Sequence, residues 1–280
     1  MIRAKSNSPK ISIVMPCFNS VDFIERSIRS VVEQDYGNIE LFIKDGGSTD
    51  GTVDIILYYA KKYPNIIRWI SAKDKGQTEA INYGMKKVNG EILCYLNGDD
   101  VYKKGALTKV AEFFEKNPSI MWAYGKADII NNDDKKIRGW ITAYKNFWLE
   151  NYSYNTLLIL NYISQMACFW RKEAYAKVGE FDAKQHYVMD YDYWLKLGSK
   201  FKADVIRGYL ASFRLVSTTK SSTGFIQQFQ DEYETVKKYT NSDVILFLHR
   251  LHIYVIILVY SLLKFINSFS SAKLNQQGND

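Results

Sequence analysis

Two adjacent carboxylates, Asp99 and Asp100, follow a run of five apolar residues at 92–96. Such a run predicts a buried strand, and Gly98 just before the two carboxylates permits a sharp turn of the backbone. Two like charges at a buried strand end are unfavourable by several kcal/mol unless a positive group compensates them. Because open α/β sheets bind ligands beyond the carboxyl ends of their strands, the pair predicts a site for Mg²⁺ or Mn²⁺, which suit oxygen ligands. The alternative is a turn with two solvated aspartates.

A second stretch able to do chemistry is the turn at 45–52, which is rich in glycine and short polar residues. The turn has no P-loop lysine, and the chain contains no Gly-x-Gly-x-x-Gly. Asp45 opens the turn at the end of a predicted strand. A carboxylate there can accept hydrogen bonds from a base edge while the amides of the following helix approach a phosphate. The turn therefore indicates nucleotide binding, with a simple capped turn as the alternative.

The segments that must position these residues alternate between strand and helix. Apolar runs predict strands at 11–15, 39–43, 66–70, 92–96 and 203–207. Helical periodicity predicts helices at about 22–34, 52–62, 77–88, 105–116, 171–178 and 190–197. Between 125 and 165 we expect short strands and one helix near 145–160. This alternation predicts an α/β fold with a mainly parallel sheet and helices on both faces.

Composition places the 280-residue chain among ordinary globular proteins, since 47% of its residues are hydrophobic and 24% are charged. The net charge of +7 comes largely from scattered lysine pairs, which favours solvated faces over a nucleic-acid-binding stripe. Cys17, Cys94 and Cys168 lie too far apart for a disulfide framework or a zinc site, so we expect three reduced cysteines in a cytosolic protein. Residues 1–10 are polar and are not followed by the apolar h-region of a signal peptide, so no secretory signal is expected.

The segment 244–266 is the most apolar part of the chain, with 18 apolar residues out of 23. Its longest uninterrupted apolar run, 253–260, has eight residues, whereas a membrane-spanning helix needs about 20. Three interpretations stay open: a helix lying in the plane of a membrane interface, a buried or dimer-interface helix, and a membrane span. The aromatic and cationic residues around the segment favour the first.

Four motifs resemble those of family 2 glycosyltransferases in order and spacing. They are Met15-Pro16-Cys17-Phe18-Asn19, the turn at 45–52, the stretch 74–84 that begins Asp-Lys-Gly-Gln, and Leu96-Asn97-Gly98-Asp99-Asp100. The likeness covers residues from about 10 to 220. It implies the GT-A fold, a nucleotide-sugar donor and inversion at the anomeric carbon.

The resemblance also implies roles for individual residues. The nucleotide pocket would be lined by Pro16, Phe18 and Asn19, and Asp45 would read the edge of the base, usually uracil. The residues near the pyrophosphate and the sugar would be Asp74, Lys75, Gln77 and Asn82. Asp99 and Asp100 would hold the ribose and the metal. Asn97 stands where the family often has the first aspartate of Asp-x-Asp, and since asparagine brings no charge, we expect weaker metal binding.

The stretch Met189-Asp190-Tyr191-Asp192-Tyr193-Trp194 resembles the helix start that carries the catalytic base of the family. By that resemblance Asp190 takes the proton of the acceptor hydroxyl as its oxygen attacks the anomeric carbon. Met189 replaces the usual glutamate, which leaves the acceptor pocket less polar. Arg214, in a late loop, is interpreted either as a phosphate ligand or as a structural ion-pair partner.

The resulting hypothesis is a metal-dependent inverting glycosyltransferase that uses Mn²⁺ or Mg²⁺. It would move a hexose from a nucleotide sugar, with a UDP-sugar expected, to a hydroxyl of a glycan or a lipid-linked acceptor. We expect this in bacterial surface polysaccharide biosynthesis at the cytoplasmic face of the membrane, with peripheral membrane contact through 244–266 and no nucleic-acid partner. One alternative is a catalytically inactive nucleotide-sugar-binding subunit, favoured by Asn97 and Met189. Another is a nucleotidyltransferase, although the loop after the first strand lacks the basic residues that bind a triphosphate.

The predicted domain organisation is a GT-A domain at 1–240 followed by an apolar helix and polar tail at 241–280. Within the domain, 10–124 would bind the nucleotide sugar and 125–240 would bind the acceptor.

Overall fold

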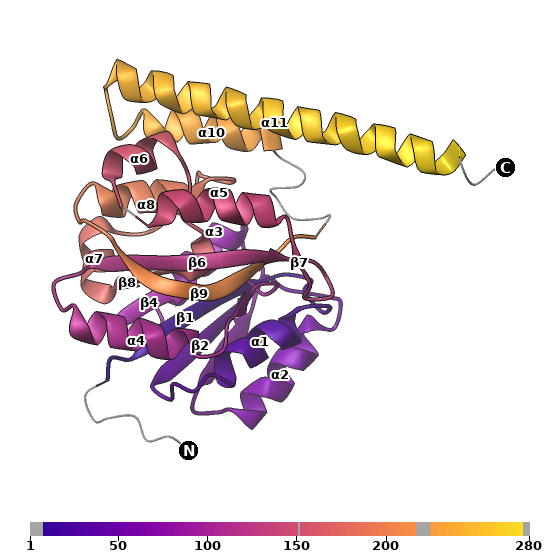
Figure 1. The fold of residues 1–280 in the computed structure, drawn as a ribbon. Coiled ribbons are helices and arrows are strands. Elements are labelled where there is room, and N and C mark those ends of the chain that lie inside the picture. Colours follow the sequence, from indigo (N-terminus) through magenta and orange to yellow (C-terminus); the bar gives the residue numbers. More distant parts are fainter. Residues whose placement is uncertain (1–7, 151, 217–224, 277–280) are drawn as a thin grey trace.

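The alternation of strands and helices builds one mixed sheet in the computed structural model, which describes residues 8–150, 152–216 and 225–276 (Figure 1). The strands are β1 (Ile11–Cys17), β2 (Ile39–Asp45), β3 (Ile67–Ser71), β4 (Ile92–Tyr95), β5 (Val101–Tyr102), β6 (Trp122–Ile130), β7 (Lys136–Ile137), β8 (Cys168–Arg171) and β9 (Asp204–Arg214). They run in the order β3-β2-β1-β4-β8-β6-β9-β5, and β7 pairs with β6.

The first four strands of that order are parallel, as the sequence predicts. The second part of the sheet is mixed: β6 and β9 are parallel, whereas β8 is antiparallel to both β4 and β6. The expected mainly parallel sheet is therefore found around the first four strands, and the rest is mixed. The predicted boundary at 124/125 falls within β6, so the two predicted halves share one sheet.

The helices are α1 (Ile24–Val32), α2 (Thr52–Lys62), α3 (Gln77–Met85), α4 (Ala106–Lys116), α5 (Gly139–Leu149), α6 (Tyr154–Ile159), α7 (Lys172–Val178), α8 (Met189–Gly198), α10 (Phe225–Val236) and α11 (Asp243–Gln276), with a short 3₁₀ helix η1 (Gln165–Ala167). The single helix expected near 145–160 is wrong, because two helices, α5 and α6, occupy that region. A new helix starts there because the Ser153 side chain accepts the backbone N–H of Thr156 and caps α6. The sequence analysis also did not predict α10.

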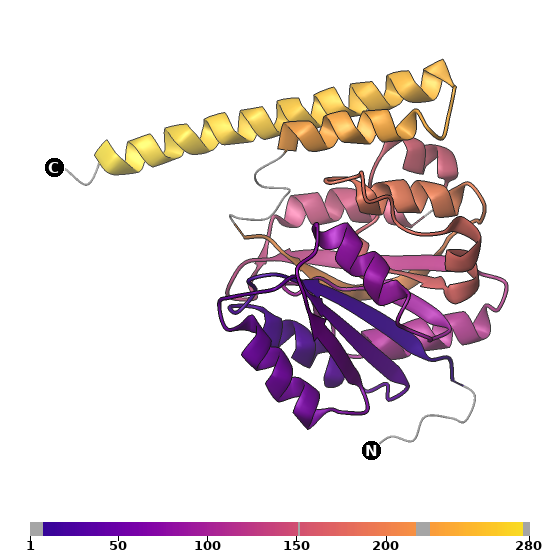
Figure 2. The same cartoon turned by 180° about the vertical axis from the view of Figure 1, so that it is seen from behind.

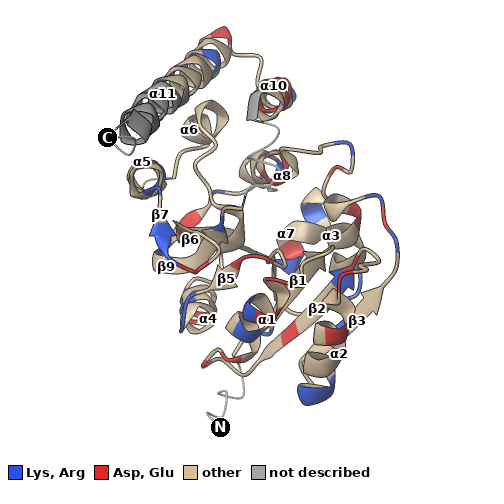
Figure 3. Cartoon of the chain, turned by 90° about the vertical axis from the view of Figure 1, so that its right-hand side faces the viewer, with Lys and Arg blue, Asp and Glu red and all other residues tan. Residues whose placement is uncertain are grey.

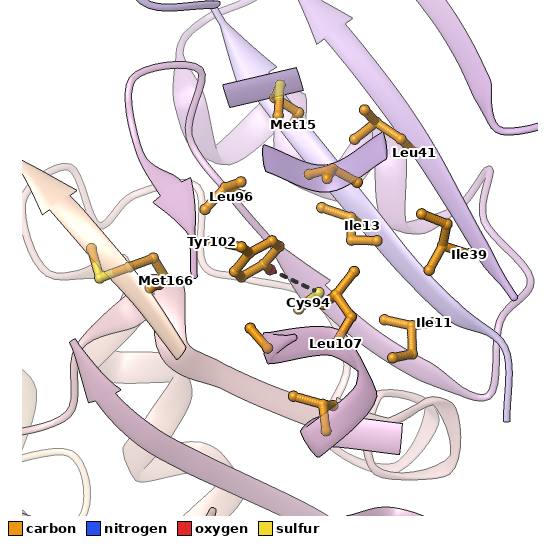
Figure 4. Close-up of a cluster of buried hydrophobic side chains, with 14 of the residues drawn as sticks. Ile11, Ile13, Met15, Ile39, Leu41, Cys94, Leu96, Tyr102, Leu107 and Met166 are labelled. Carbon is orange, nitrogen blue, oxygen red and sulfur yellow. Dashed lines mark hydrogen bonds between the residues drawn. The ribbon is translucent and has the colours of Figure 1, made fainter. Parts of the chain in front are cut away.

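Side chains alternate along the strands between two apolar layers. Ile11, Ile13 and Met15 of β1 pack on one face with α1, α2 and α4, while Val14 packs on the other face with α3, α6, α7 and α8. Figure 4 shows part of the first layer, where the Tyr102 hydroxyl lies 3.3 Å from the Cys94 sulfur. The three cysteines are free and buried, as predicted. Both faces of the sheet are covered, so residues at the strand ends are the ones left to meet a ligand.

The helix pair α10 and α11 lies over the α6 and α8 side of the domain, and α11 extends well past the sheet (Figures 1 and 2). The predicted helix over 244–266 is confirmed and is longer than expected. Of the three interpretations of this segment, the membrane span finds no support. Within the described part of the chain, no helix combines the length and the apolar character that crossing a membrane requires.

Candidate active site

The candidate site lies at the carboxyl ends of the neighbouring strands β1 and β4. The chain passes from β1 to β2 and β3 on one side of β1 and returns to β4 on the other side, so the carboxyl ends of β1 and β4 form a topological switch point. Ligands of open α/β sheets bind in the crevice at such a point. The segments that leave the sheet there are Phe18–Asn19 after β1 and Asn97–Asp100 after β4. Predicted residues from two motifs therefore meet at one edge.

Asp45 closes β2 and is fully buried. Its carboxylate accepts the backbone N–H groups of Gly47 and Ser48, both at 2.9 Å, and the hydroxyls of Ser48 and of Ser71, the latter at 2.6 Å. Burial raises the pKa of Asp45, but these four hydrogen bonds outweigh it and hold the pKa below its usual value. In this structure Asp45 shapes the turn 46–48, so its reading of a base edge stays a prediction without support from its contacts.

Asn19 ties the loop after β1 to the loop after β2. Its backbone has a positive φ of 47°, which asparagine tolerates better than most residues. Its amide oxygen accepts the Thr49 N–H at 3.0 Å, and its own N–H donates to the Ser48 hydroxyl at 2.7 Å. The Asn19 side chain therefore holds the two loops together, and its direct contact with a nucleotide stays a prediction.

Phe18, Gly46 and Asp74 converge beside these loops. Phe18 follows the last residue of β1 and is 61% exposed, whereas Pro16, two residues earlier, is buried within the strand. A methyl group added to Gly46 would lie 3.3 Å from the Phe18 ring and 3.4 Å from the Asp74 carboxylate. The buried Lys44 amine donates to Asp74 at 2.9 Å and holds that carboxylate in place. An exposed aromatic face, a bare backbone and a fixed acceptor lie together here, which is an arrangement that suits a planar base.

Asn97 lies at the centre of a hydrogen-bonded chain next to the Asp99–Asp100 turn. Its amide oxygen accepts the Gln77 amide at 2.6 Å, and its amide nitrogen lies 3.1 Å from Asp100 Oδ2 and 3.3 Å from Gln165 Oε1. Gln165 in turn donates to the Tyr95 carbonyl at 2.7 Å. The structure thus brings together the predicted residues Gln77, Asn97 and Asp100. Sequence reasoning missed Gln165, which lies in the loosely patterned region between 125 and 165.

Arg214, at the end of β9, clamps the turn that carries the two carboxylates. Its backbone N–H donates to Asp100 Oδ1 at 2.9 Å, and its Nε donates to the Asp99 carbonyl at 2.8 Å. The rest of the buried guanidinium group bonds to the Asn131 carbonyl and to the Asp134 carboxylate. Of the two interpretations of Arg214, the structure supports the structural one.

Asp99 and Asp100 differ in exposure: Asp99 is partly exposed, whereas Asp100 is fully buried. Burial raises the pKa of Asp99, although its own backbone amide and Arg214 act in the opposite direction. For Asp100, burial and then the charge of Asp99 raise the pKa well above its usual value. The two carboxylates therefore repel each other, and the surrounding protein compensates them only in part.

Gly98 is required by close packing, which differs from the turn role that the sequence suggests. A Cβ at this position would lie 2.9 Å from Cys17 Cβ, closer than real Cβ atoms approach, and 3.1 Å from Ile24 Cδ1, which is a tight contact. The Gly98 N–H donates to the Pro16 carbonyl at 3.1 Å, and its carbonyl accepts the Ser27 hydroxyl at 2.9 Å. The absence of a side chain lets the segment after β4 lie directly against the end of β1.

The Asp99–Asp100 turn fits a divalent cation, with Asp99 as its accessible carboxylate. The donors are oxygens, and a cation would compensate the repulsion between the two carboxylates. Asp100 is less accessible, since each of its oxygens already accepts a hydrogen bond. Among the described residues no group of three or more His, Cys, Asp or Glu side chains converges on one point. Mg²⁺ is commonly held by one or two carboxylates together with substrate phosphates, and Asp99 offers one such carboxylate.

Two other predicted donor-binding residues lie apart from the crevice network. Asn82 is buried on α3, where its amide donates to the Phe181 carbonyl at 2.8 Å and accepts the Phe181 N–H at 3.0 Å. These contacts make it a structural link and give no support to donor binding. Lys75 is exposed in the loop before α3, where its N–H donates to Glu79, so it is available to a ligand.

Asp190 is the second residue of α8 and is partly exposed. The start of α8 packs on the donor side of the site, since the Thr78 hydroxyl of α3 lies 2.8 Å from the Met189 sulfur. The charges of Asp190 and Asp100 both act on the buried phenol of Tyr95, whose pKa burial raises well above its usual value. The predicted base and one of the predicted metal-binding aspartates therefore both act electrostatically on the last residue of β4.

Two further ionisable side chains, Glu232 and Lys145, interact with the charge of Asp190. Glu232 of α10 accepts the Asn161 amide at 3.0 Å and the Gln228 amide at 3.2 Å. Burial and the Asp190 charge raise its pKa to about 7, although these two hydrogen bonds and Lys145 of α5 lower it. Burial lowers the pKa of Lys145, against the charges of Asp190 and Glu232. Sequence reasoning missed this group, because its members are far apart along the chain.

Comparisons with known proteins agree with this geometry. The family described as Glycosyl transferase family 2 matches residues 12–179. An uncharacterized glycosyltransferase of Nostoc sp. is 34% identical over 128 residues, which are 46% of this chain and 39% of that protein. One from Haemophilus influenzae is 29% identical over 78% of this chain and 84% of its own length. A PGL/p-HBAD biosynthesis glycosyltransferase of Mycobacterium bovis is 27% identical over 66% of this chain and 68% of its own length.

Solved structures share the fold at low sequence identity. The mannosyltransferase PcManGT of Pyrobaculum calidifontis, in complex with GDP-Man and Mn²⁺, has a TM-score of 0.67 and 14% identity, covering 89% of this chain and 70% of that one. TarS 1–349 of S. aureus, in complex with UDP-GlcNAc, has a TM-score of 0.66 and 17% identity, covering 84% of this chain and 67% of that one. These likenesses support the predicted GT-A-like fold, a mixed and mostly parallel sheet flanked by helices.

Proposed function

This chain belongs to Glycosyl transferase family 2 and is a glycosyltransferase, and we propose that it transfers a hexose from a nucleoside-diphosphate sugar, with a UDP-sugar as the expected donor. The acceptor would be a hydroxyl of a glycan or of a lipid-linked saccharide. The transfer would invert the configuration of the anomeric carbon. The observation that carries the proposal is the position of Asp99 and Asp100 just beyond the carboxyl end of β4, at the switch point of the sheet beside β1. The exposed Phe18 ring, beside Gly46 and Asp74, is the proposed seat of the base. The diphosphate would lie between that seat and Asp99.

Asp190 is the proposed general base. Its carboxylate would take the proton of the acceptor hydroxyl while that oxygen forms a bond to the anomeric carbon, and the bond from that carbon to the diphosphate oxygen breaks. The partly exposed position of Asp190 leaves its carboxylate accessible to an acceptor.

Asp99 is the proposed main ligand of Mn²⁺ or Mg²⁺, with Asp100 beside it. A bound divalent cation would neutralise negative charge on the departing diphosphate. Arg214 and Asn97 would hold the two carboxylates in position through their hydrogen bonds to the Asp99–Asp100 turn.

The proposed acceptor and cellular location rest on the relatives of this chain and on its apolar segment 244–266. The similar mycobacterial proteins are glycosyltransferases of PGL/p-HBAD biosynthesis, so relatives of this chain act in the synthesis of bacterial glycolipids. We propose surface polysaccharide or glycolipid synthesis at the cytoplasmic face of a membrane, with peripheral contact through 244–266.

The first experiment is a thermal-shift panel of UDP, GDP, dTDP and CDP, each with Mn²⁺ and with EDTA. A ligand that binds only the folded state raises the melting temperature. We expect one nucleotide to raise it only with Mn²⁺, and Asp99→Ala to abolish the shift. Asp35→Ala, which removes an exposed carboxylate after α1, is the matched control and should keep it. No shift with any nucleotide would contradict the donor site.

Transfer is then measured with sugars of the nucleotide that binds. Release of nucleoside diphosphate that depends on acceptor, and its loss in Asp190→Asn with nucleotide binding retained, would support the assigned base. If the wild-type protein binds nucleotide but transfers to no lipid-linked or glycan acceptor, the alternative of an inactive nucleotide-sugar-binding subunit gains support.

A further inference from the structure

The helix α11 is apolar on the side that faces away from the domain as well as on the side that packs against it. Eight large apolar residues with exposures between 37 and 68% face outward: Val244, Phe247, Leu248, Leu251, Tyr254, Val255, Leu258 and Val259. At 100° per residue they cover a continuous arc of about 140° around the helix. A helix that is apolar all round is normally buried, so this outward face calls for a partner.

Two of the polar residues of α11 point toward the protein instead. His249 is fully buried, and its Nδ1 lies 2.9 Å from the Leu158 carbonyl. Arg250 donates to the Tyr233 hydroxyl at 2.7 Å and lies over the Tyr233 ring. Internal contacts therefore hold these polar groups, and the outward arc is left to leucine, valine and aromatic side chains.

The exposed arc continues onto α5. Trp140, Tyr144 and Phe147 follow one another at helical spacing with exposures of 47, 38 and 74%. The Tyr144 hydroxyl lies 2.6 Å from His252 Nε2 of α11, and the two rings stack. Figure 3 shows α5 beside α11. The eight residues of α11 and the three of α5 form one surface, which we call the α5–α11 surface.

Charge and composition identify the occupant of this surface. From Val244 to Gln276 the chain has no acidic residue, and besides the internally bound Arg250 it has the two cations Lys264 and Lys273. The whole chain carries a net charge of +7. Tryptophan and tyrosine prefer the boundary between hydrocarbon and water, and cations favour an anionic headgroup layer. These are the features of a helix that lies in a membrane interface.

A second copy of the chain fits this surface less well. Two helices that pair through a coiled-coil seam bury a narrow stripe of a and d positions, whereas the arc on α11 is wider and adjoins an aromatic row on another helix. A flat lipid surface can cover both helices at once. The extension of α11 past the domain leaves that side of the described helix open to such a surface (Figures 1 and 2).

We propose that the α5–α11 surface docks this protein onto an anionic lipid bilayer, with the aromatic row of α5 and the apolar arc of α11 both inserted at the headgroup boundary. The proposal adds α5 to the membrane contact and assigns the inserting side chains. It does not depend on the identity of the donor. Because the Leu158 carbonyl contacts both His249 of α11 and the hydroxyl of Tyr191, the residue after Asp190, docking would bring the acceptor side of the site close to the lipid.

The test is sedimentation of the full-length protein with vesicles of phosphatidylcholine alone and of phosphatidylcholine mixed with phosphatidylglycerol. We expect the protein to sediment with the anionic vesicles and at least tenfold less with the neutral ones. The double variant Phe247→Asp/Leu258→Asp should lower binding to anionic vesicles at least tenfold, and Trp140→Ser/Phe147→Ser should lower it severalfold. All four side chains are exposed, so the fold should be kept, and a circular dichroism melt checks this.

Leu57→Asp is the matched control, because Leu57 is a similarly exposed apolar residue on α2, away from the proposed surface. It should bind as the wild type does. The proposal is overturned if the wild-type protein stays in the supernatant with both vesicle types, or if the α11 double variant still binds. Concentration-dependent dimerisation that the same double variant abolishes, without vesicle binding, would assign the surface to a second copy. Vesicle binding is measured without donor or acceptor, so its failure is separate from a failure of the proposed transfer reaction.

Discussion

The ends of β2 and β4 both carry buried aspartates, yet the two ends are built in opposite ways. Asp45 after β2 accepts four hydrogen bonds from its own turn and from β3, and its pKa lies below the usual value. Asp99 and Asp100 after β4 lie side by side, and burial raises the pKa of both. The first end is complete by itself, whereas the second gains stability from an added positive charge. A buried carboxylate thus indicates a ligand site only when its own protein leaves it uncompensated.

Removing a carboxylate from the β4 end should have the largest effect on function. We expect Asp99→Ala to lower transfer by at least about 10³-fold, because charge stabilisation by a metal contributes several kcal/mol to such reactions. Its free energy of unfolding without metal should stay the same or increase, since the mutation relieves repulsion on Asp100. Turnover assays and urea denaturation in EDTA measure the two quantities. A variant that loses stability and keeps transfer would reverse the comparison.

Removing the carboxylate from the β2 end should instead lower stability. Asp45→Ala leaves four partly buried donors without their charged acceptor, which should reduce the free energy of unfolding by about 3 to 4 kcal/mol. Urea denaturation checks this. Asp54→Ala, an exposed substitution on α2 of the same kind, should change it by less than about 1 kcal/mol. Equal effects of the two substitutions would mean that the hydrogen bonds of Asp45 contribute little.

Glu232 extends the comparison to a third buried carboxyl group, which resembles the β4 end. Its folded-state pKa is raised from 4.5 to about 7, so the native protein binds a proton that the unfolded chain has released. Stability is therefore fully present below pH 4.5 and is lost as the pH rises toward 7, by about 2 to 3 kcal/mol. Glu232→Gln should be free of this loss. Denaturation of both proteins at pH 5 and pH 8 measures the difference, and a gap that does not widen with pH would contradict the prediction.

The smallest effect should come from removing a single hydrogen bond of Asp45. Ser71→Ala removes one of its four hydrogen bonds and should lower the free energy of unfolding by about 1 kcal/mol, with little change in nucleotide binding. Ser199→Ala, whose hydroxyl bonds to a nearby helical carbonyl at the surface, should change it by less than about 0.5 kcal/mol. A loss of nucleotide binding in Ser71→Ala without a loss of stability would point to a direct role of Asp45 in the pocket.

Much of the fold could be predicted from the sequence because local pattern decides it. Apolar runs located β1 to β4 within about two residues, and helical periodicity located α2, α4 and α8 equally well. The region 125–165 was predicted poorly, since β6, α5 and α6 form through contacts with distant segments. The long β9 shows the same effect, because its pairing with β6 extends it to Arg214, well beyond the apolar run at 203–207.

The candidate site divides in the same way. The position of Asp99 at a strand end could be predicted from its apolar run and its adjacent acid. The contacts of Asp45, Asn82 and Arg214 could not be predicted, because their partners Ser71, Phe181 and Asp134 lie 26, 99 and 80 residues away in the chain. A motif indicates which side chains meet a ligand, but contacts decide which of them remain available.

The sequence by itself determined the alternation of strands and helices, the four motifs and the apolar character of 244–266, because each depends on residues that are neighbours in the chain. The tertiary structure decided that Asp45 completes its own turn, that Asp99 stays partly exposed while Asp100 is buried, that the buried Glu232 feels the charge of Asp190, and that α5 extends the apolar face of α11. Burial, charge compensation and surface continuity depend on distances between remote segments, and only the packed sheet and helices set those distances.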